Sequence, residues 1–188
     1  MSAGTALRFP RSAVVRMDDV CIRPATRDDA AEIAAIYNHY IRATVITFEE
    51  QEITAADMAG RLAAVNASGL PWLIAESAGV IVGYAYADRW RQRSAYRHSV
   101  ESTIYLDPAR TGAGIGIVLY QQLLGALPAS VHVVIGGIAL PNAASVALHE
   151  RLGFAQVAHF HEVGLKFERW IDVGYWQKTL QMSAQVRA

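Results

Sequence analysis

The stretch over residues 99–127 constrains the fold of this chain more than any other segment. An extended, β-favouring run comes first, and Pro108 stops it because proline cannot continue a paired strand. Three closely spaced glycines follow, Gly112, Gly114 and Gly116, and apolar residues then recur with helical spacing until the next proline. The sequence therefore predicts a strand, a glycine-rich loop and a helix in direct succession.

A glycine loop in this position can bind phosphate, because backbone N–H groups without a neighbouring Cβ approach phosphate oxygens at a helix N-terminus. Arg110 lies at the entrance of the loop and can add a charge-assisted contact. The loop has no Gly-Lys-Ser/Thr, and it lacks the third glycine and the later acidic residue of a dinucleotide fingerprint. It is therefore predicted to bind another pyrophosphate-bearing ligand, or to be a tight turn that only packs the strand on the helix.

Short β-like runs and amphipathic helical segments alternate along the rest of the chain, which indicates an α/β or α+β domain around one mixed sheet. Thr26 with Asp29 forms a capping-box-like helix start, and Asn142 with Gly153 marks the two ends of a short helix. We expect helices over residues 26–41, 54–65, 115–127 and 143–152, and strands over residues 72–76, 80–88, 99–107, 131–138, 155–163 and 173–180.

The 188 residues are enough for one domain with a sizeable core. We expect this domain over residues 19–182, with a poorly ordered tail over residues 1–18 and a short tail over residues 183–188. The single cysteine, Cys21, excludes an intramolecular disulfide framework, and the cytoplasm is the default compartment. No stretch has the pattern of a secretory signal or a membrane span.

The charges of the chain cancel, since 17 Lys and Arg balance 17 Asp and Glu. A domain that binds nucleic acid or an anionic membrane usually carries a basic excess, so the balance argues against both partners. A small anionic ligand remains compatible with it, because one local site can be strongly charged. The low net charge also favours association with a second copy of the chain.

Several motifs together resemble the GNAT superfamily of N-acetyltransferases, within it the phosphinothricin and methionine sulfoximine acetyltransferase branch. The general motifs are Ile104-Tyr105-Leu106-Asp107-Pro108, the glycine loop and residues 142–154. The motifs of the branch are Asn38-His39-Tyr40, Ser94-Ala95-Tyr96, Glu101-Ser102-Thr103, Lys166-Phe167, Trp170 and residues 172–177. The resemblance covers residues 22–180 and implies a central, mostly antiparallel twisted sheet flanked by helices.

The resemblance implies acetyl-CoA as co-substrate and no metal. The backbone amides of Ile104, Tyr105 and Leu106 would then bind the pantetheine arm and polarise the acetyl carbonyl. The other residues implied for the cofactor are Arg110, Thr111, Gly112, Ala113, Gly114, Ile115, Gly116, Ile117, Asn142 and Arg151. Thr111 stands where the family usually has Gln or Arg, and its hydroxyl can still donate to a phosphate. A helix N-cap explains Asn142 equally well, and a solvated helix face explains Arg151.

The resemblance implies Glu101 as the general base and His149 as the acid or orienting group. A substrate ammonium must lose a proton before its nitrogen attacks a thioester, and a carboxylate among apolar neighbours has a raised pKa suited to that task. Histidine titrates near neutrality and can protonate a thiolate whose thiol has a pKa of about 8.5. The alternatives are a solvent-facing edge glutamate and a histidine of the helix surface or core.

The implied reaction is a direct attack, in a ternary complex, by the primary amine of a small amino-acid-like molecule. The residues proposed to bind this acceptor are Phe48, Arg91, Ser94, Ala95, Tyr96, Lys166 and Trp170. Three arginines and no acid over residues 91–97 favour an anionic acceptor over a polyamine, an aminoglycoside or a peptide N-terminus. An acyl-CoA-binding module without turnover is the alternative from another class, and the carboxylate of Glu101 argues against it.

Two further expectations concern partners and metals. The resemblance implies a homodimer, and the aromatic run over residues 170–176 is compatible with one. His159 and His161 are two residues apart and would face the same side of a strand, but two ligands without a third are weak support for a metal. We therefore predict no metal site.

Overall fold

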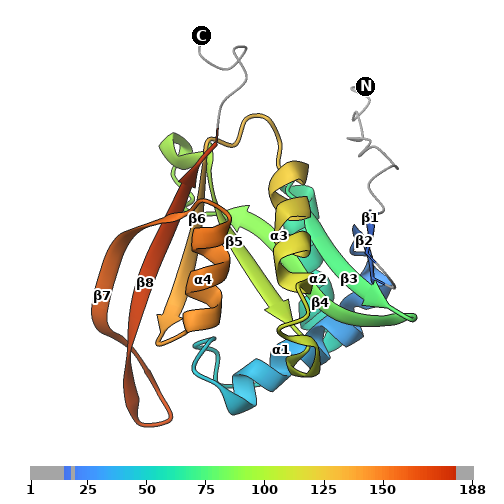
Figure 1. Cartoon of the computed structure of the whole chain (residues 1–188), viewed down its shortest axis with the longest axis horizontal. Coiled ribbons are helices and arrows are strands. Elements are labelled where there is room, and N and C mark those ends of the chain that lie inside the picture. The colour runs from blue at the N-terminus through green and yellow to red at the C-terminus, as the bar shows by residue number, and fades with distance from the viewer. Residues whose placement is uncertain (1–14, 18–19, 181–188) are drawn as a thin grey trace.

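A computed structural model of the chain describes residues 15–17 and 20–180 (Figure 1). Its eight-stranded sheet has the order β1-β2-β3-β4-β5-β6-β8-β7. The strands are β1 (Val15–Met17), β2 (Val20–Pro24), β3 (Trp72–Ser77), β4 (Val80–Arg89), β5 (Ser99–Leu106), β6 (Val133–Leu140), β7 (Ala155–Lys166) and β8 (Arg169–Thr179). The α-helices are α1 (Ala30–Ala43), α2 (Ala55–Ala67), α3 (Ile115–Ala126) and α4 (Ala143–Arg151). None of these helices is long and apolar enough to cross a membrane.

One pair of neighbouring strands is parallel, and the others are antiparallel. The parallel pair is β5 with β6, which the crossover helix α3 connects. Hairpins and longer connections supply the antiparallel neighbours on both sides. The mixed, mostly antiparallel sheet predicted from the sequence is therefore confirmed.

An ion pair between the half-buried Arg23 and the buried Asp29 anchors the start of the first helical segment. The backbone N–H of Thr26 donates to Asp29 Oδ2 at 2.6 Å, and both Nη atoms of Arg23 donate to the same carboxylate at 2.8 Å. Burial alone would raise the pKa of Asp29, but the hydrogen bonds from Arg23 and Thr26 lower it. The ionised carboxylate thus joins the capping turn to β2. A short 3-10 turn over Arg27–Asp29 precedes α1, which begins at Ala30.

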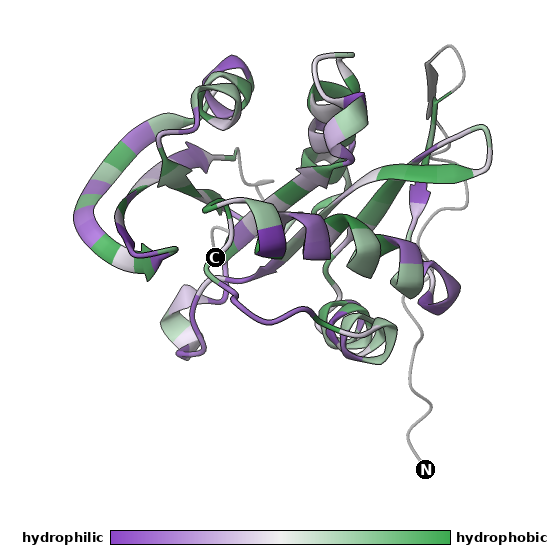
Figure 2. Ribbon diagram, turned by 90° about the horizontal axis from the view of Figure 1, so that it is seen from below, coloured by the Kyte–Doolittle hydropathy of each residue, from purple (hydrophilic) through white to green (hydrophobic). Residues whose placement is uncertain are grey.

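The helices cover both faces of the sheet, and neighbouring side chains of β5 contact different layers. The ring of Tyr105 packs on Tyr37 and Tyr40 of α1, with centroids 5.2 and 4.9 Å apart. Leu106 packs on α3, where a Cβ added to Gly116 would lie 3.3 Å from its Cδ1. Figure 2 shows helices on both sides of the sheet, each banded with hydrophilic and hydrophobic segments, as helices that cover a core are.

Two regions differ from the sequence-based expectation. Val15–Met17, inside the expected tail over residues 1–18, form the edge strand β1; the rest of that tail lies outside the described residues, as do residues 183–188. The last hairpin is also longer than predicted, because it turns at Phe167 and Glu168, both with positive φ (51° and 57°). Two-residue hairpin turns usually carry Gly, Asn or Asp at such positions, so this turn had no recognisable signal.

Candidate active site

Strands β5 and β6 separate partway along their length. They pair only where residues 99–101 meet residues 133–135. Beyond that point β5 continues to Leu106 beside β4, and β6 continues to Leu140 beside β8, so their carboxyl ends diverge (Figure 1). Backbone groups on the open side of β5 are therefore no longer paired with β6.

A cavity of about 230 Å³ lies in this opening. The loop after α1, the diverging ends of β5 and β6, and α4 form its walls. The lining residues are Ile46, Thr47, Phe48, Glu101, Ser102, Thr103, Ile104, Tyr105, Gly137, Ile138, Ala139, Asn142, Ser145 and His149. The fold thus brings both predicted catalytic residues, Glu101 and His149, to one cavity.

Glu101 lies on the α1 side of the opening. The neighbouring Ser102 hydrogen-bonds Tyr120 of α3 at 2.6 Å, and successive side chains of a strand point to opposite faces. On its own face, the Glu101 Oε1 atom lies 3.2 Å from where a Cβ of Gly137 would be. Among the described residues, no side chain or backbone group donates a hydrogen bond to this carboxylate, which leaves it available to a ligand.

The electrostatic surroundings of Glu101 suit a base. Burial raises the pKa of its carboxyl, the positive charge of Arg91 lowers it, and the negative charge of Asp88 raises it again. The net effect is an increase above the ordinary value. A carboxylate with a raised pKa binds a proton more readily, so it is a better general base than an exposed glutamate.

His149 lies on the other face of the sheet, with 4% of its surface exposed. Its Nδ1 is 2.8 Å from the carbonyl oxygen of Ser145, which can only accept, so Nδ1 carries the proton. In the neutral ring Nε2 then accepts from the Tyr120 hydroxyl at 3.1 Å, and this hydroxyl is 2.6 Å from Ser102 Oγ. Burial lowers the pKa of His149, although the bond to Ser145 opposes this. The result is a neutral imidazole with a defined tautomer.

The buried network of His149, Tyr120 and Ser102 joins α4, α3 and β5. Tyr120 itself is fully buried, and Ser102 has a second acceptor, the Ile135 carbonyl oxygen, at 3.3 Å. No sequence signal indicates a role for Tyr120 or for Ser102 in this network. Tyr120 recurs among the apolar residues of an amphipathic helix, so the pattern alone marks it as core.

Two adjacent glycines in β6 make room for the two catalytic candidates. A Cβ on Gly136 would lie 2.4 Å from His149 Nε2, and a Cβ on Gly137 would lie 3.2 Å from Glu101 Oε1. Any larger residue at Gly136 would collide with the imidazole. Both glycines lie within the strand predicted over residues 131–138, and no sequence signal indicates a function for them.

The glycine loop between β5 and α3 is closed by its own hydrogen bonds. Thr111 Oγ1 donates to the Pro108 carbonyl oxygen at 3.1 Å, so the hydroxyl expected to reach a phosphate is used within the loop. Gly112 and Gly114 both have φ of +79°, a conformation that favours glycine, and Gly114 is the N-cap of α3. The first N–H groups of α3 therefore face out of a compact turn, as a phosphate-binding loop requires.

The remaining cofactor candidates differ in how accessible their side chains are. Arg110 and Arg151 are exposed, at the loop and at the end of α4, where they are free to meet an anion. Ile115 is buried and Ile117 half-buried, so their side chains pack and only their backbone can serve a ligand. Asn142 lines the cavity, but its Oδ1 also accepts from the Ser145 N–H at 3.1 Å as the N-cap of α4.

Phe48 belongs to the loop after α1, and Lys166 of β7 hydrogen-bonds the same loop. Of the two, only Phe48 lines the cavity. The Phe48 ring covers Gly164 of β7 so closely that a Cβ there would lie 2.4 Å from its Cζ. Lys166 is 1% exposed, and its Nζ donates to the Thr47 carbonyl oxygen at 2.8 Å. Burial lowers the pKa of this ammonium group, although nearby glutamates raise it. Lys166, predicted to bind the substrate, thus contacts the loop that carries Phe48 and does not line the cavity.

The other acceptor candidates lie outside the cavity lining. Arg91 packs its guanidinium over the Trp90 ring at 4.7 Å, and Tyr96 meets the same ring edge to face at 5.7 Å. Ser94, Ala95 and Tyr96 form an exposed 3-10 turn. Trp170, predicted as a wall of the acceptor site, is 61% exposed on β8 and does not line the cavity.

The chain is similar to known proteins over most of its length. Residues 22–174 match the family model described as acetyltransferase (GNAT) domain. A phosphinothricin N-acetyltransferase of Streptomyces viridochromogenes is 38% identical over 88% of this chain and 91% of its own. An L-methionine sulfoximine/L-methionine sulfone acetyltransferase of Salmonella typhimurium is 36% identical over 87% and 96%. A phosphinothricin acetyltransferase of Sinorhizobium meliloti, solved with acetyl-CoA, superposes with a TM-score of 0.83 at 33% identity, covering 89% of this chain and 91% of that one.

Proposed function

Because the chain belongs to the GNAT family of acetyltransferases, we propose that it transfers acetyl from acetyl-CoA to the primary amine of a small amino-acid-like acceptor. The relatives named for phosphinothricin and methionine sulfoximine support that acceptor class. The observation that carries the proposal is the opening between β5 and β6, where Glu101 and His149 reach one cavity from opposite faces of the sheet.

Glu101 is proposed as the general base. The acceptor arrives as an ammonium, and one N–H bond must break before its nitrogen can form a bond to the acetyl carbon. The carboxylate of Glu101 has a raised pKa and no hydrogen-bond donor in the described part of the chain, so it can take this proton directly or through water. Because Gly137 has no side chain, β6 leaves room beside the Glu101 carboxylate for a ligand in the cavity.

The backbone of β5 is proposed to bind acetyl-CoA, the co-substrate that carries the acetyl group. Past residue 101, the open edge of β5 has no strand partner in β6. Successive backbone N–H groups of a strand point to alternate edges, and that of Asp107 donates to the Val82 carbonyl oxygen of β4. The amides of Ile104 and Leu106 therefore face the opening and can donate to a ligand, whereas that of Tyr105 points toward β4. The exposed N–H groups at the start of α3, with Arg110, can bind phosphates. Donors fixed by a sheet and a helix need little reorganisation when charge develops on the carbonyl oxygen.

His149 is proposed to control the proton that the leaving thiolate receives. His149 lines the cavity itself, and its lowered pKa means that a proton taken up from solvent is held weakly and passes readily to the thiolate. The thiolate then becomes a thiol and the imidazole returns to its neutral form. In that form Tyr120 donates to Nε2 and Ser102 donates to Tyr120, so the ring also orients both hydroxyls.

The acceptor is proposed to enter from the face that carries Glu101. Phe48 forms one wall of the cavity there, and Arg91 is near enough to Glu101 to lower its pKa. A cation at Arg91 can bind the carboxylate of an amino acid while its ammonium reaches Glu101. Lys166 would act indirectly, by fixing the loop over residues 46–48.

We also propose that the enzyme is a cytoplasmic homodimer. Six large apolar side chains of the β7–β8 hairpin are between 48% and 61% exposed: Val157, Phe160, Val163, Leu165, Phe167 and Trp170. Such a concentration of exposed apolar surface is typical of an interface. Cys21 is a free thiol, as is usual in the reducing cytoplasm. Sedimentation equilibrium should give twice the mass of the chain.

Thiol release from acetyl-CoA with a panel of amines tests the proposed activity. We expect turnover with methionine sulfoximine, phosphinothricin or glutamate, and little with spermidine or an aminoglycoside. Turnover confined to the cationic amines would move the acceptor to another class. Acetyl-CoA binding by calorimetry without turnover of any amine would refute the enzyme and leave an acyl-CoA-binding module.

A further inference from the structure

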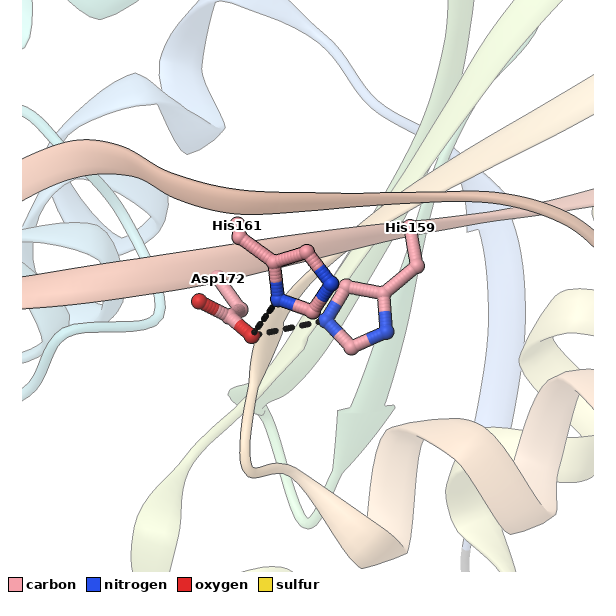
Figure 3. A group of neighbouring side chains, drawn as sticks. All are labelled: His159, His161 and Asp172. Carbon is pink, nitrogen blue, oxygen red and sulfur yellow. Dashed lines mark hydrogen bonds and ion pairs between the residues drawn. The ribbon is translucent and has the colours of Figure 1, made fainter.

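Three potential metal ligands converge on the outer hairpin of the sheet (Figure 3). Asp172 of β8 contacts two imidazoles of β7 with one carboxylate oxygen: His159 Nε2 is 2.7 Å and His161 Nδ1 is 3.0 Å from Asp172 Oδ2. The two rings are 4.3 Å apart between centroids and only 34° from parallel. None of the three residues lines the active-site cavity.

The backbone of β7 builds this arrangement through a bulge. Phe160 pairs with Val173 and Gly164 pairs with Ile171, so residues 161–163 all lie opposite Asp172. Bulges in a strand re-aim side chains and are commonly found at functional positions. Here the bulge keeps His161 on the side of Asp172 that His159 also faces.

The bulge also fixes the carboxylate. Glu162 has a φ of 53°, which is unusual for a residue with a side chain, and its N–H donates to Asp172 Oδ1 at 2.9 Å. That bond, and then the bond from His159, lower the pKa of Asp172 to about 2, so the carboxylate is ionised at neutral pH. One carboxylate oxygen is held by the backbone, and the other is shared by the two imidazoles.

We propose that His159, His161 and Asp172 bind one divalent transition-metal ion of the zinc type. Two imidazole nitrogens and one carboxylate oxygen are ligands that Zn²⁺, Co²⁺ and Ni²⁺ accept, whereas Mg²⁺ and Ca²⁺ prefer sites made of oxygen alone. Each neutral imidazole carries one proton, which must move to its other nitrogen when the metal takes the ligand position.

The distances need only a small adjustment for this ion. Donor atoms about 2.0–2.1 Å from a tetrahedral zinc lie roughly 3.3–3.4 Å apart, which is about 0.6–0.7 Å more than the His159 distance of 2.7 Å and about 0.3–0.4 Å more than the His161 distance of 3.0 Å. The side chain of His161 is 77% exposed and that of His159 is 38% exposed, so both can move outward. Water would complete the coordination on the exposed side.

The sequence shows two histidines and no third ligand at suitable spacing, and on that ground it predicts no metal site. The third ligand comes from the neighbouring strand, and the unpredicted turn at Phe167 and Glu168 sets the pairing that brings it there. The proposal does not depend on the acetyltransferase reaction, because the site stands apart from Glu101 and His149.

Competition of Zn²⁺ between a chromophoric chelator and the tag-free, full-length protein tests the proposal. We expect one ion per chain, and a loss of affinity of at least about tenfold in both His161→Gln and Asp172→Asn, as for removal of residues that support a metal. His98→Gln is the matched control, since the side chain of His98 has only the carbonyl oxygen of Ser130 as a hydrogen-bond partner in the described chain. Its affinity should equal that of the wild type.

Three results would overturn the assignment. The first is no binding of micromolar Zn²⁺ by the wild type. The second is equal affinity in wild type, His161→Gln and Asp172→Asn, since zinc would then be bound elsewhere. The third is displacement of zinc by equimolar Mg²⁺, which would exclude nitrogen ligands. Because His161 is exposed, its substitution should leave the fold intact, and circular dichroism of each variant checks this.

Discussion

Replacing Gly136 of β6 with alanine should displace the His149 imidazole from its position in the candidate active site. The new Cβ would lie 2.4 Å from His149 Nε2 and 2.7 Å from its Cδ2, whereas ordinary contacts begin at 3.4 Å. The ring would have to retreat by the difference between 3.4 and 2.4 Å, about 1 Å. It has little room, because Phe154 lies 5.2 Å away between centroids and Ser145 holds Nδ1.

Two magnitudes follow for Gly136→Ala. Overpacking of this kind costs about 1–3 kcal/mol, which corresponds to a decrease in Tm of roughly 2–12 °C for a chain of this size. A catalytic group displaced by about 1 Å can lose on the order of 10² in rate. We therefore expect kcat to fall by about that factor at a temperature where circular dichroism shows the variant still folded.

Gly60→Ala is the matched control for Gly136→Ala. Gly60 is in α2 with no atom within 4 Å of an added Cβ, so alanine should stabilise the helix by about 0.5–1 kcal/mol and leave kcat unchanged. Thermal unfolding and thiol release measure both quantities. Wild-type kcat and Tm in Gly136→Ala would refute the placement of the His149 ring, and with it the role given to the Tyr120 hydrogen bond.

Three further predictions concern charge and anchoring. Lys166→Met leaves the Thr47 carbonyl without its partner, so we expect a loss of about 1–3 kcal/mol in urea unfolding and a higher KM for the amine, with kcat changed less. His149 has a lowered pKa in the folded state, so the wild type should lose stability as pH falls below about 6.5, and His149→Gln should show a shallower slope of Tm against pH. The pKa of Glu101 is raised in the folded state, so the folded state binds this proton more tightly than the unfolded state does. Above that pKa the ionised carboxylate therefore destabilises the folded state. Glu101→Gln should raise Tm at pH 8, and this gain should be lost by pH 4. A Glu101→Gln variant less stable than wild type at pH 8 would contradict the assigned burial.

The order of helices and strands was predictable because each depends on local signals. Capping residues at Thr26 and Thr54 and the glycines after Pro108 act within a few residues, and the corresponding helices begin close to the predicted positions. The turn at Phe167 and Glu168 has no such signal, because its backbone conformation is imposed by the pairing of β7 with β8. The length of the last hairpin was therefore missed.

The site was predictable only in part, for a similar reason. Glu101 and His149 belong to motifs, so the resemblance predicts roles for them, and the structure places both at one cavity. For Lys166, the sequence could not show that its ammonium donates to the Thr47 carbonyl, and its role toward the substrate stays a prediction. Tyr120 contacts His149, and the glycine pair of β6 makes room for His149 and Glu101, only when α3, α4 and β6 pack together, so local sequence patterns cannot show these contacts.

The pH dependence of kcat/KM for acetylation of L-methionine sulfoximine, in wild type and Glu101→Gln, tests the central claim most directly. We expect wild-type activity to fall on the acid side as Glu101 takes up a proton at its raised pKa. Glu101→Gln should lose on the order of 10² in kcat and should lack this acid limb. A variant with the wild-type rate and the wild-type acid limb would contradict the assignment of Glu101 as the base that prepares the amine for attack.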